Sequence, residues 1–382
     1  MTATPTPAKG LEGIVVASTK LSRVQGDIGR LTYCGYDIRD LARNASFEEV
    51  IYLLWNLKLP NLAELTAFKK DVAAAMPLPA DMLKVMKSLP TKVHPMAALR
   101  TIVSLGGLYD PIAEDNSPEA NRKKALTLTA RMPTMIAAFS RIRDGQEPIA
   151  PRADLSIAAN YLYMLEGKEP DPVSVQAINR YLILLADHGM NASTFTACVV
   201  TSTDGDMYSA VTASIGTLKG PKHGGANEAA MRMFKEVQES GLSVADWFKQ
   251  ARANDRRLMG IGHRVYKALD PRAEILKEDA EALAKNSGNA VWFEIASELE
   301  ACARADQYFI ERKLFANVDY YSAIVLYTLN IPTDMFTPLF ALSRVAGWTA
   351  HIMEQWADNR LIRPKAEYVG EMDLKFVPVD QR

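Results

Sequence analysis

The 382-residue sequence predicts an all-α protein, mostly helical, with a short β element near its N-terminus. Helical spacing of apolar residues dominates, strand signals are few, and the alternation of strands and helices that is typical of a parallel sheet is missing. The length favours two domains. Glycine and proline cluster at 218–225 and 258–272. We therefore expect a large domain formed by 1–222 and 327–382, and a small domain formed by 223–326.

Two stretches near the N-terminus carry the strand signals. "GIVVAS" at 13–18 and "RLTYCGYDI" at 30–38 are rich in β-branched and aromatic residues. A glycine-containing segment separates them, which is typical of a turn between paired strands. We expect one small β element at this end of the chain.

Helix-start signals follow directly. In "SFEEVIYLLWNLK", Ser46 is followed three residues later by Glu49, and apolar residues then recur at helical spacing. Asn61 and Glu64 repeat this pattern in "NLAEL". In such a capping box each side chain accepts a hydrogen bond from the backbone N–H of the other residue, so both stretches predict helix N-termini.

The stretch from 116 to 145 predicts a long helix. Ser117 is the expected cap, Pro118 occupies the first helical position, and Gly145 marks the end. Pro133 lies inside this helix and is expected to kink it. Further helices are expected within 173–189, 271–285, 291–313 and 338–359.

The composition is ordinary for a soluble globular protein, with 48% hydrophobic and 23% charged residues. A net charge of −1 creates no field that attracts nucleic acid or an anionic membrane. Cys34, Cys198 and Cys302 have no metal-like spacing and indicate a reducing compartment. No run of about 18 apolar residues predicts a membrane span, and the start "MTATPTPAKGLEG" lacks the features of a targeting segment. We expect a cytoplasmic protein.

The five histidines fall into two groups. His94 precedes a proline and His351 lies in an apolar helical stretch, so both are expected to be structural residues within packed helices. His188, His223 and His263 each lie beside glycine, at the expected end or start of a helix. Glycine lets the backbone come close to a ligand. These three histidines are therefore the candidates for a functional site.

His223 stands in "GPKHGGAN" at an expected helix N-terminus. The positive end of the helix dipole disfavours an imidazolium there, which favours a neutral ring. Such a ring can donate a hydrogen bond to a carbonyl oxygen and to the enol that forms from it. A polar hinge residue is the alternative, and the residues alone leave both interpretations open.

No metal site is expected, because the three candidate histidines are 35 and 40 residues apart and the cysteines do not add ligand spacing. The segment 251–277 holds seven Lys or Arg against three Asp or Glu. Basic side chains beside a glycine-rich turn suit a polyanionic ligand such as a nucleotide-bearing cofactor. A solvated basic face is the alternative, since no standard nucleotide motif is present.

Three further residues attract attention. Asp319 stands before an apolar helical stretch, where N-capping is the ordinary role; facing a pocket instead, it would gain a raised pKa and serve as a base. Arg344 lies in a mostly apolar helical stretch with no matching acid at helical spacing before it, and Arg363 precedes a proline. A substrate carboxylate could be the partner that a buried arginine needs.

Together these motifs resemble the citrate synthase family. The resemblance rests on "GPKHGGANE", "GIGHRVYKALDPRAE", "NVDYYSA", "FTPLFALSRVAGWTAHIMEQ" and "LIRPKAEYVG", in this order. In the first half it rests on "GYDIRDLARNASFEEVIYLLWNLKLP", "VHPMAALR" and "ADHGMNASTFTA". It covers nearly the whole chain and looks like the shorter bacterial and archaeal type.

The resemblance implies a mostly helical homodimer whose large and small domains close over the active site. It implies that acetyl-CoA and oxaloacetate condense to citryl-CoA, which is hydrolysed to citrate and CoA, with acetyl-CoA as co-substrate and no permanently bound cofactor. By resemblance, Asp319 takes a proton from the acetyl methyl group, and His223 hydrogen-bonds the thioester oxygen. His263 donates a proton to the oxaloacetate carbonyl.

The resemblance also implies the binding residues. Oxaloacetate would be held by His188, Arg272 and Arg344, with Arg363 reaching in from the partner subunit. The CoA moiety would lie along Arg257, Leu258, Met259, Gly260 and Ile261, with Lys267 near its phosphates.

Three alternatives stay open at this point. A 2-methylcitrate synthase uses propionyl-CoA on the same scaffold. A metal-dependent hydrolase would use His223, His263 and Asp319 as ligands. A non-catalytic helical interaction module would use none of them for chemistry.

Overall fold

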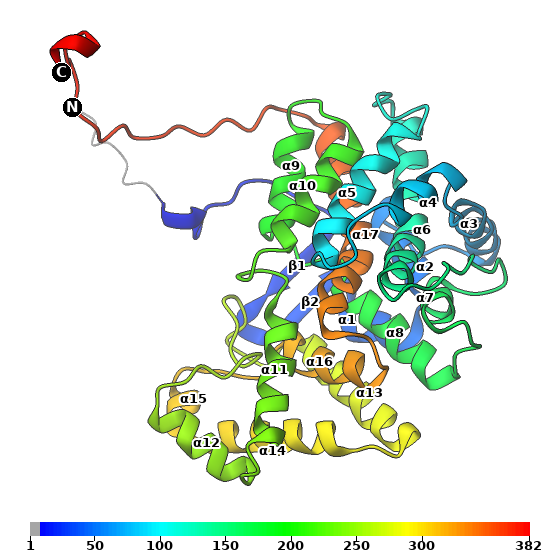
Figure 1. Ribbon diagram of the computed structural model, residues 1–382, viewed down its shortest axis with the longest axis vertical. Helices are drawn as coiled ribbons and strands as arrows, with labels where there is room; N and C mark the ends of the chain where they lie inside the picture. Colours follow the sequence, from blue (N-terminus) through cyan, green and yellow to red (C-terminus); the bar gives the residue numbers. More distant parts are fainter. Residues whose placement is uncertain (1–7) are drawn as a thin grey trace.

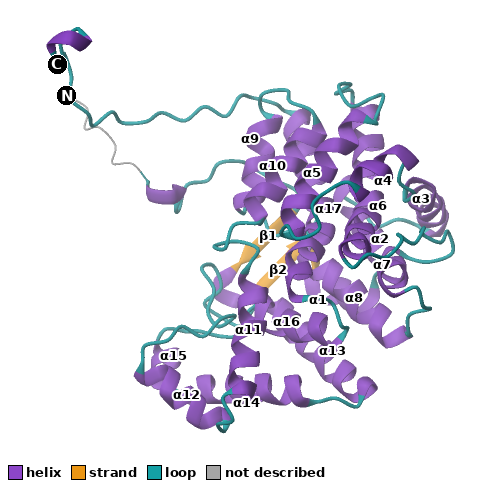
Figure 2. Ribbon diagram, viewed as in Figure 1, coloured by secondary structure: helices purple, strands orange, loops and turns teal. Residues whose placement is uncertain are grey.

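Residues 8–382 of the computed structural model contain 17 α-helices and one three-stranded sheet, which confirms the predicted all-α class (Figure 2). The structure describes residues 8–382. Residues 1–7, the beginning of the N-terminal stretch that is expected to lack a targeting segment, lie outside the described residues. Within residues 8–382, no helix combines the length and apolar character needed to cross a membrane.

The sheet is antiparallel and consists of β1 (Ser22–Gln25), β2 (Arg30–Tyr33) and β3 (Tyr36–Asp37). The prediction for 30–38 is confirmed in part, because β2 and β3 lie there with a turn between them. The predicted strand at 13–18 is wrong. This segment is irregular, projects away from the helical body (Figure 1) and pairs with no strand of residues 8–382; Val15 is 88% exposed. β-branched residues favour a strand only where there is a pleated surface to pack against.

The helices follow one another through short connections. Their bounds are α1 Ile38–Asn44, α2 Phe47–Asn56, α3 Leu62–Ala75, α4 Ala80–Lys87, α5 Pro95–Leu108, α6 Pro118–Arg143, α7 Ile157–Glu166, α8 Pro172–Leu185, α9 Ala192–Thr201, α10 Met207–Leu218, α11 Ala226–Glu239, α12 Val244–Ala253, α13 Pro271–Ser287, α14 Val291–Ala305, α15 Gln307–Glu311, α16 Val318–Thr328 and α17 Phe336–Ala357.

The predicted caps are confirmed. Capping boxes begin α2 at Ser46 and α3 at Asn61, and the Ser117 side chain caps α6. α6 continues through Pro133 as one helix. The stretch 291–313, predicted as one helix, is two: Asp306 is extended and caps α15 with its side chain. A short polar residue that can bond the backbone ahead of it favours this kind of break.

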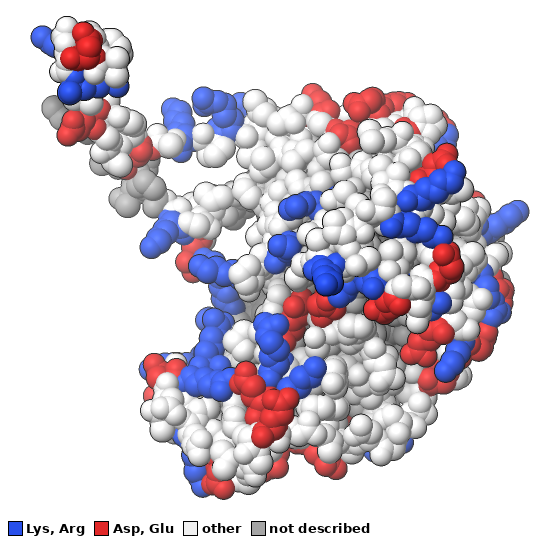
Figure 3. Space-filling view, viewed as in Figure 1, with Lys and Arg blue, Asp and Glu red and all other residues white. Residues whose placement is uncertain are grey.

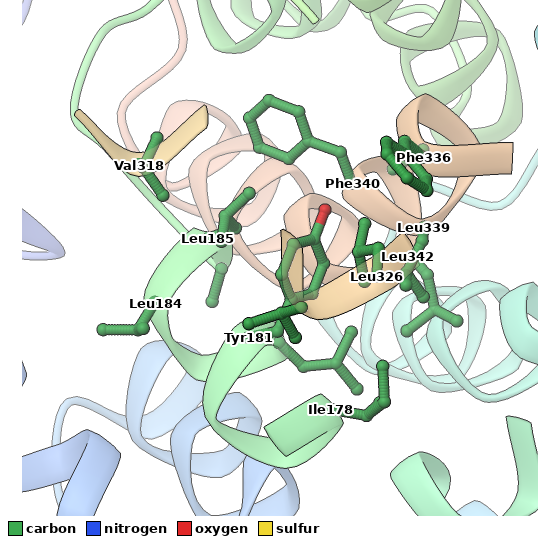
Figure 4. Close-up of a cluster of buried hydrophobic side chains, with 14 of the residues drawn as sticks. Ile178, Tyr181, Leu184, Leu185, Val318, Leu326, Phe336, Leu339, Phe340 and Leu342 are labelled. Atoms are coloured by element: carbon green, nitrogen blue, oxygen red, sulfur yellow. The ribbon is translucent and has the colours of Figure 1, made fainter. Parts of the chain in front are cut away.

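Helix α17 runs through the middle of the helical body and is buried over most of its length. It packs against α6, α8, α9, α10 and α2. Figure 4 shows side chains of α8, such as Tyr181 and Leu185, meeting Phe340 and Leu342 of α17 and Leu326 of α16. This core fixes the end of α8, which precedes His188, and holds α16 and α17, which carry Asp319 and Arg344.

Helices α11, α12, α14 and α15 gather at one end of the molecule, whereas α2 to α10 lie at the other (Figure 1). Between them, α13 contacts both α16 and α8. This arrangement agrees with the expected small domain at 223–326, and the boundary itself stays a prediction. Beyond α17, residues 358–382 leave the helical body as an extended tail (Figure 1).

Candidate active site

Five segments supply three histidines, one aspartate and one arginine of the candidate site, and Arg272 lies in the first turn of α13. His188 lies in the loop after α8, His223 in the turn between α10 and α11, and His263 in the loop before α13. Asp319 lies in the first turn of α16, and Arg344 in the buried part of α17.

The loop that carries His263 is tied to the start of α16 by main-chain hydrogen bonds. Gly262 N donates to Phe315 O at 2.7 Å, and Asn317 N donates to Gly260 O at 2.9 Å. Gly260 has a φ of +78°, and a Cβ at this position would lie 2.9 Å from Tyr320 Cα. The glycine-rich sequence thus permits a close approach that brings His263 and Asp319 into one unit.

His263 is held as a neutral ring with a defined tautomer. Its Nδ1 accepts hydrogen bonds from Val265 N at 2.9 Å and from Tyr266 N at 3.1 Å. Since a backbone N–H can only donate, the ring proton resides on Nε2. Burial, followed by the positive charge of Arg272, lowers the pKa of His263 to about 4. The Nε2–H group is therefore a hydrogen-bond donor at neutral pH.

His223 has the opposite tautomer. Ser193 N donates to its Nε2 at 3.4 Å, and Ser193 Oγ lies 2.8 Å from the same nitrogen. The ring proton is therefore on Nδ1. Burial, followed by the charge of Arg344, lowers the pKa of His223 to about 4. The neutral ring that was expected from a helix dipole thus has a different main cause, since α11 begins only at Ala226.

Asp319 is not the N-cap of α16. Asn317 takes that role by accepting a hydrogen bond from Asp319 N at 2.9 Å. Burial raises the pKa of Asp319 to about 6, although the charge of Arg272 acts in the opposite direction. The carboxyl group is thus ionised at pH 7 and is a stronger base than an ordinary aspartate.

The two buried arginines of the site differ in their partners. Arg272 is paired with Asp270 through Nε at 3.0 Å and Nη2 at 2.8 Å. Arg344 is 1% exposed, and its Nε donates to Leu185 O at 2.7 Å. Among residues 8–382, no Asp or Glu oxygen lies within 4.0 Å of the Arg344 guanidinium. Burial lowers the pKa of Arg344 to about 10. Arg344 is thus a buried cation with capacity for an anionic ligand.

His188 completes the group. Its Nε2 lies 3.1 Å from Tyr266 Oη, and its ring centroid lies 5.6 Å from that of His263. Burial, followed by the charge of Arg272, holds the pKa of His188 well below its usual range. His263 and His223 both lie close enough to affect the protonation of His188, so the three glycine-flanked histidines of the sequence lie in one region.

The residues predicted to bind CoA, and Arg363, differ in how exposed they are. Leu258, Gly260 and Ile261 are buried in the loop beside α16, Met259 is half-buried, and the side chains of Arg257 and Lys267 are exposed. Basic side chains gather on the side of the molecule where α11 and α15 lie (Figure 3). Arg363 is exposed in the extended tail and does not join the site of its own chain. Within the described residues, no group of three or more His, Cys, Asp and Glu is arranged to hold a metal ion.

Sequence reasoning missed three residues of the site. Ser193 determines the tautomer of His223, Asp270 holds Arg272, and Tyr266 contacts His188. Asp270 before a proline does have a local signal as a helix cap, and it caps α13. Its side chain pairs with Arg272 as well, which the capping pattern does not indicate.

A neutral histidine pair with defined tautomers, a carboxylate base and a free buried arginine define an enzyme site of the general acid–base class on a helical fold. The family model described as the citrate synthase C-terminal domain matches residues 10–365. The chain belongs to the citrate synthase family.

Similar proteins support this assignment. Citrate synthase 2 of Bacillus subtilis is 50% identical over 379 residues, which cover 99% of this chain and 100% of that relative. 2-Methylcitrate synthase 1 of Corynebacterium glutamicum is 39% identical and covers 98% of each chain. The structure of citrate synthase from Thermoplasma acidophilum, in ternary complex with carboxymethyl coenzyme A and oxaloacetate, superposes with a TM-score of 0.92. It is 35% identical and covers 99% of this chain and 100% of that chain. The resemblance, the fold class and the enzyme class predicted from the sequence are confirmed.

Proposed function

We propose that this chain condenses acetyl-CoA with oxaloacetate and hydrolyses the resulting citryl-CoA to citrate and CoA. The observation that carries the proposal is the combination of a base with a pKa of about 6, Asp319, and two neutral histidine donors, His223 and His263. Such a set can remove a proton from a weakly acidic carbon while hydrogen bonds stabilise the enol that forms.

Each residue then has one role in the condensation. Asp319 removes a proton from the methyl group of acetyl-CoA, while His223 Nδ1–H donates a hydrogen bond to the thioester oxygen. The methyl carbon attacks the carbonyl carbon of oxaloacetate, and His263 Nε2–H protonates the carbonyl oxygen as the C–C bond forms. Water then cleaves the thioester C–S bond, and CoA leaves as the thiol.

The substrate carboxylates are matched by the buried charges. Arg344 lacks an acidic partner and is the main contact that we propose for oxaloacetate, with Arg272 and His188 beside it. Two arginines can orient a dicarboxylic keto acid for attack, which lowers the entropic part of the barrier. We propose that CoA lies along 257–261 with Lys267 near its phosphates, where Figure 3 shows exposed basic side chains nearby.

We further propose a cytoplasmic protein whose own residues perform the chemistry, with acetyl-CoA as co-substrate, no permanently bound cofactor and no metal. The free cysteines Cys34, Cys198 and Cys302 support a reducing compartment. Chelation with EDTA is therefore expected to leave the rate unchanged, whereas a metal-dependent hydrolase would lose it.

The proposal predicts an acid limb in the pH profile. Because burial raises the pKa of Asp319 to about 6, this carboxyl group gains a proton as the pH falls through 6 and ceases to act as a base. The value of kcat/KM is expected to decline about tenfold for each pH unit below that point. A steady-state series from pH 4.5 to 8 in constant ionic strength measures it. A profile that stays flat down to pH 5 contradicts the assignment of Asp319.

We propose that the active form is a homodimer in which Arg363 reaches the partner's site. The tail that carries Arg363 projects away from the helical body of its own chain. It exposes apolar side chains, among them Val369 (87% exposed) and Phe376 (82% exposed). A second copy of the chain is a suitable surface for them. Half-buried small residues of α9 and α10, such as Thr196, Ala213 and Gly216, offer a face for the remaining contact.

The dimer proposal is tested by sedimentation and by Arg363→Ala. A dimer is expected, and the variant should raise the KM for oxaloacetate at least about tenfold, because a charge-assisted hydrogen bond is lost. Arg360→Ala, in the same tail, is the matched control and should keep the KM of the wild type. A fully active monomer contradicts the role of Arg363.

The experiment that tests the activity is release of thiol from acetyl-CoA in the presence and absence of oxaloacetate. Release that depends on oxaloacetate is expected, together with a higher kcat/KM for acetyl-CoA than for propionyl-CoA. A preference for propionyl-CoA would identify the protein as a 2-methylcitrate synthase in activity. No release under any condition would favour a helical interaction module.

A further inference from the structure

A buried ion pair that the proposed chemistry does not use lies directly behind the site. Asp187 is 0% exposed and His351 is 1% exposed, and the His351 Nε2 atom lies 3.2 and 3.3 Å from the two carboxylate oxygens. Asp187 immediately precedes His188. A carboxylate at this depth requires charge compensation, because an unpaired buried charge is strongly unfavourable.

Hydrogen bonds hold both the side chain and the main chain of Asp187. The Ser22 hydroxyl of β1 donates to the carboxylate, and Gly189 N donates to it at 3.3 Å. Tyr33 Oη of β2 donates to Asp187 O at 2.8 Å and accepts from Asp187 N at 3.1 Å. The loop that carries His188 is therefore fixed to the sheet on one side and to α17 on the other.

One face of α17 contacts this loop and the adjoining ends of α8 and α9. Gly347 and Trp348 follow Arg344 by three and four residues and precede His351 by four and three, so all four lie on the same side of the helix. Gly347 N donates to Ala186 O at 3.1 Å, and Trp348 Nε1 donates to Ser193 Oγ at 3.1 Å.

The fit on this face is close. A Cβ on Gly347 would lie 2.3 Å from Ala186 O and 2.8 Å from Asp187 Oδ1. Arg344 and His351 are thus held in fixed positions relative to the same carboxylate.

The charged groups around His351 determine whether its ring is protonated. The groups that act on it are Asp187 from the loop after α8, and Glu354 and Arg344 from its own helix; Glu354 Oε2 lies 3.7 Å from His351 Nδ1. Tyr33 of β2, Cys34 of the β2–β3 turn and Cys198 of α9 are the other titratable groups that face this pair, and their pKa values are raised chiefly by burial.

Burial by itself would lower the pKa of His351, but the Asp187 carboxylate outweighs this effect and raises it. For Asp187, burial would raise the pKa, and His351 followed by Arg344 outweighs it and lowers the pKa. Both effects stabilise the pair in its charged form at neutral pH. Asp187 is therefore the anion that both His351 and Arg344 attract.

We propose that His351 is a positioning residue: as an imidazolium it engages the Asp187 carboxylate and so leaves the Arg344 guanidinium free for a carboxylate of the substrate. The inference rests on the proposed function, because it concerns the oxaloacetate subsite of that reaction. Without the imidazolium, Asp187 is an uncompensated buried anion and the Arg344 guanidinium becomes its only cation. Arg344 then binds a substrate carboxylate more weakly.

The test is His351→Gln, with steady-state kinetics for oxaloacetate. We expect the KM for oxaloacetate to rise about tenfold or more, and kcat to stay within about threefold of the wild type. The double variant Asp187→Asn/His351→Gln removes the uncompensated carboxylate and should bring the KM back toward the wild-type value. His94→Gln, a half-exposed cap of α5, is the matched control and should change neither constant.

The pH dependence distinguishes this role from a purely structural one. Since His351 is charged below its raised pKa, the wild-type KM for oxaloacetate should increase as the pH rises through that value. This alkaline limb should be missing in His351→Gln, whose KM is high throughout.

An unchanged KM in His351→Gln overturns the proposal. A wild-type KM for oxaloacetate that does not vary above neutral pH also overturns the proposal. This measurement needs no variant, so it remains a test even if His351→Gln fails to fold. A wild-type protein that releases no thiol with oxaloacetate contradicts the proposed function instead, so the two failures are distinguishable.

Discussion

Asp319→Asn is expected to lower kcat for oxaloacetate-dependent thiol release by about a hundredfold to ten-thousandfold. The amide has the shape of the carboxyl group but cannot take a proton from the methyl carbon of acetyl-CoA. The melting temperature is expected to stay the same or to rise. Burial raises the pKa of Asp319 to about 6, so its charged form is disfavoured in the folded protein and a neutral side chain relieves that cost.

The matched control is Asp334→Asn. Asp334 lies in the short 3₁₀ turn before α17, and it pairs with Arg143 at 2.6 Å. It is partly exposed, so its loss should affect neither the rate nor the melting temperature by much. If Asp319→Asn retained more than a tenth of the wild-type kcat, Asp319 would not be the base.

His223→Ala is the second change with a large expected effect. Removing an oriented donor at a developing oxyanion costs on the order of 3 kcal/mol, which corresponds to a loss in kcat of about a hundredfold to a thousandfold. The loss should appear in kcat more than in the KM for acetyl-CoA, because the hydrogen bond strengthens only as the thioester oxygen gains charge. Single-turnover measurement with saturating oxaloacetate separates this step from product release.

His94→Ala serves as the comparison for this variant. Its Nδ1 accepts a hydrogen bond from Met96 N and so caps α5, and its Nε2 lies 4.0 Å from Glu228 Oε1. A small loss of stability without a loss of kcat is expected. Equal activity of the two alanine variants would argue against His223 as the enol-stabilising donor.

The helices could be predicted because their signals are local. The capping boxes at Ser46 and Asn61 involve residues three positions apart, so the sequence pattern contains the whole interaction. The strand prediction at 13–18 failed for the complementary reason. β-branched residues such as Val15 favour a strand only where a partner exists, and here the pairing stretch is 22–25.

The sequence motifs pointed to the candidate residues that the fold brings together, but not to their supporting contacts. Ser193 is 30 residues from His223, and Asp187 is 164 residues from His351. No periodicity connects positions so far apart, since the fold alone brings them together. His351 was expected to be a structural residue satisfied within packed helices, and it is buried; what the sequence could not provide was its partner.

The main-chain link between 260–262 and 315–317 makes His263 and Asp319 parts of a single rigid unit, although they are far apart in sequence. His223, by contrast, is anchored to Ser193 at the start of α9. If the predicted small and large domains move relative to each other, we expect the separation of Asp319 from His223 to change and that of Asp319 from His263 to stay the same. In that case a small inhibitor that spans Asp319 and His263 should bind every state equally well, whereas one that spans Asp319 and His223 should bind only the state with the matching separation.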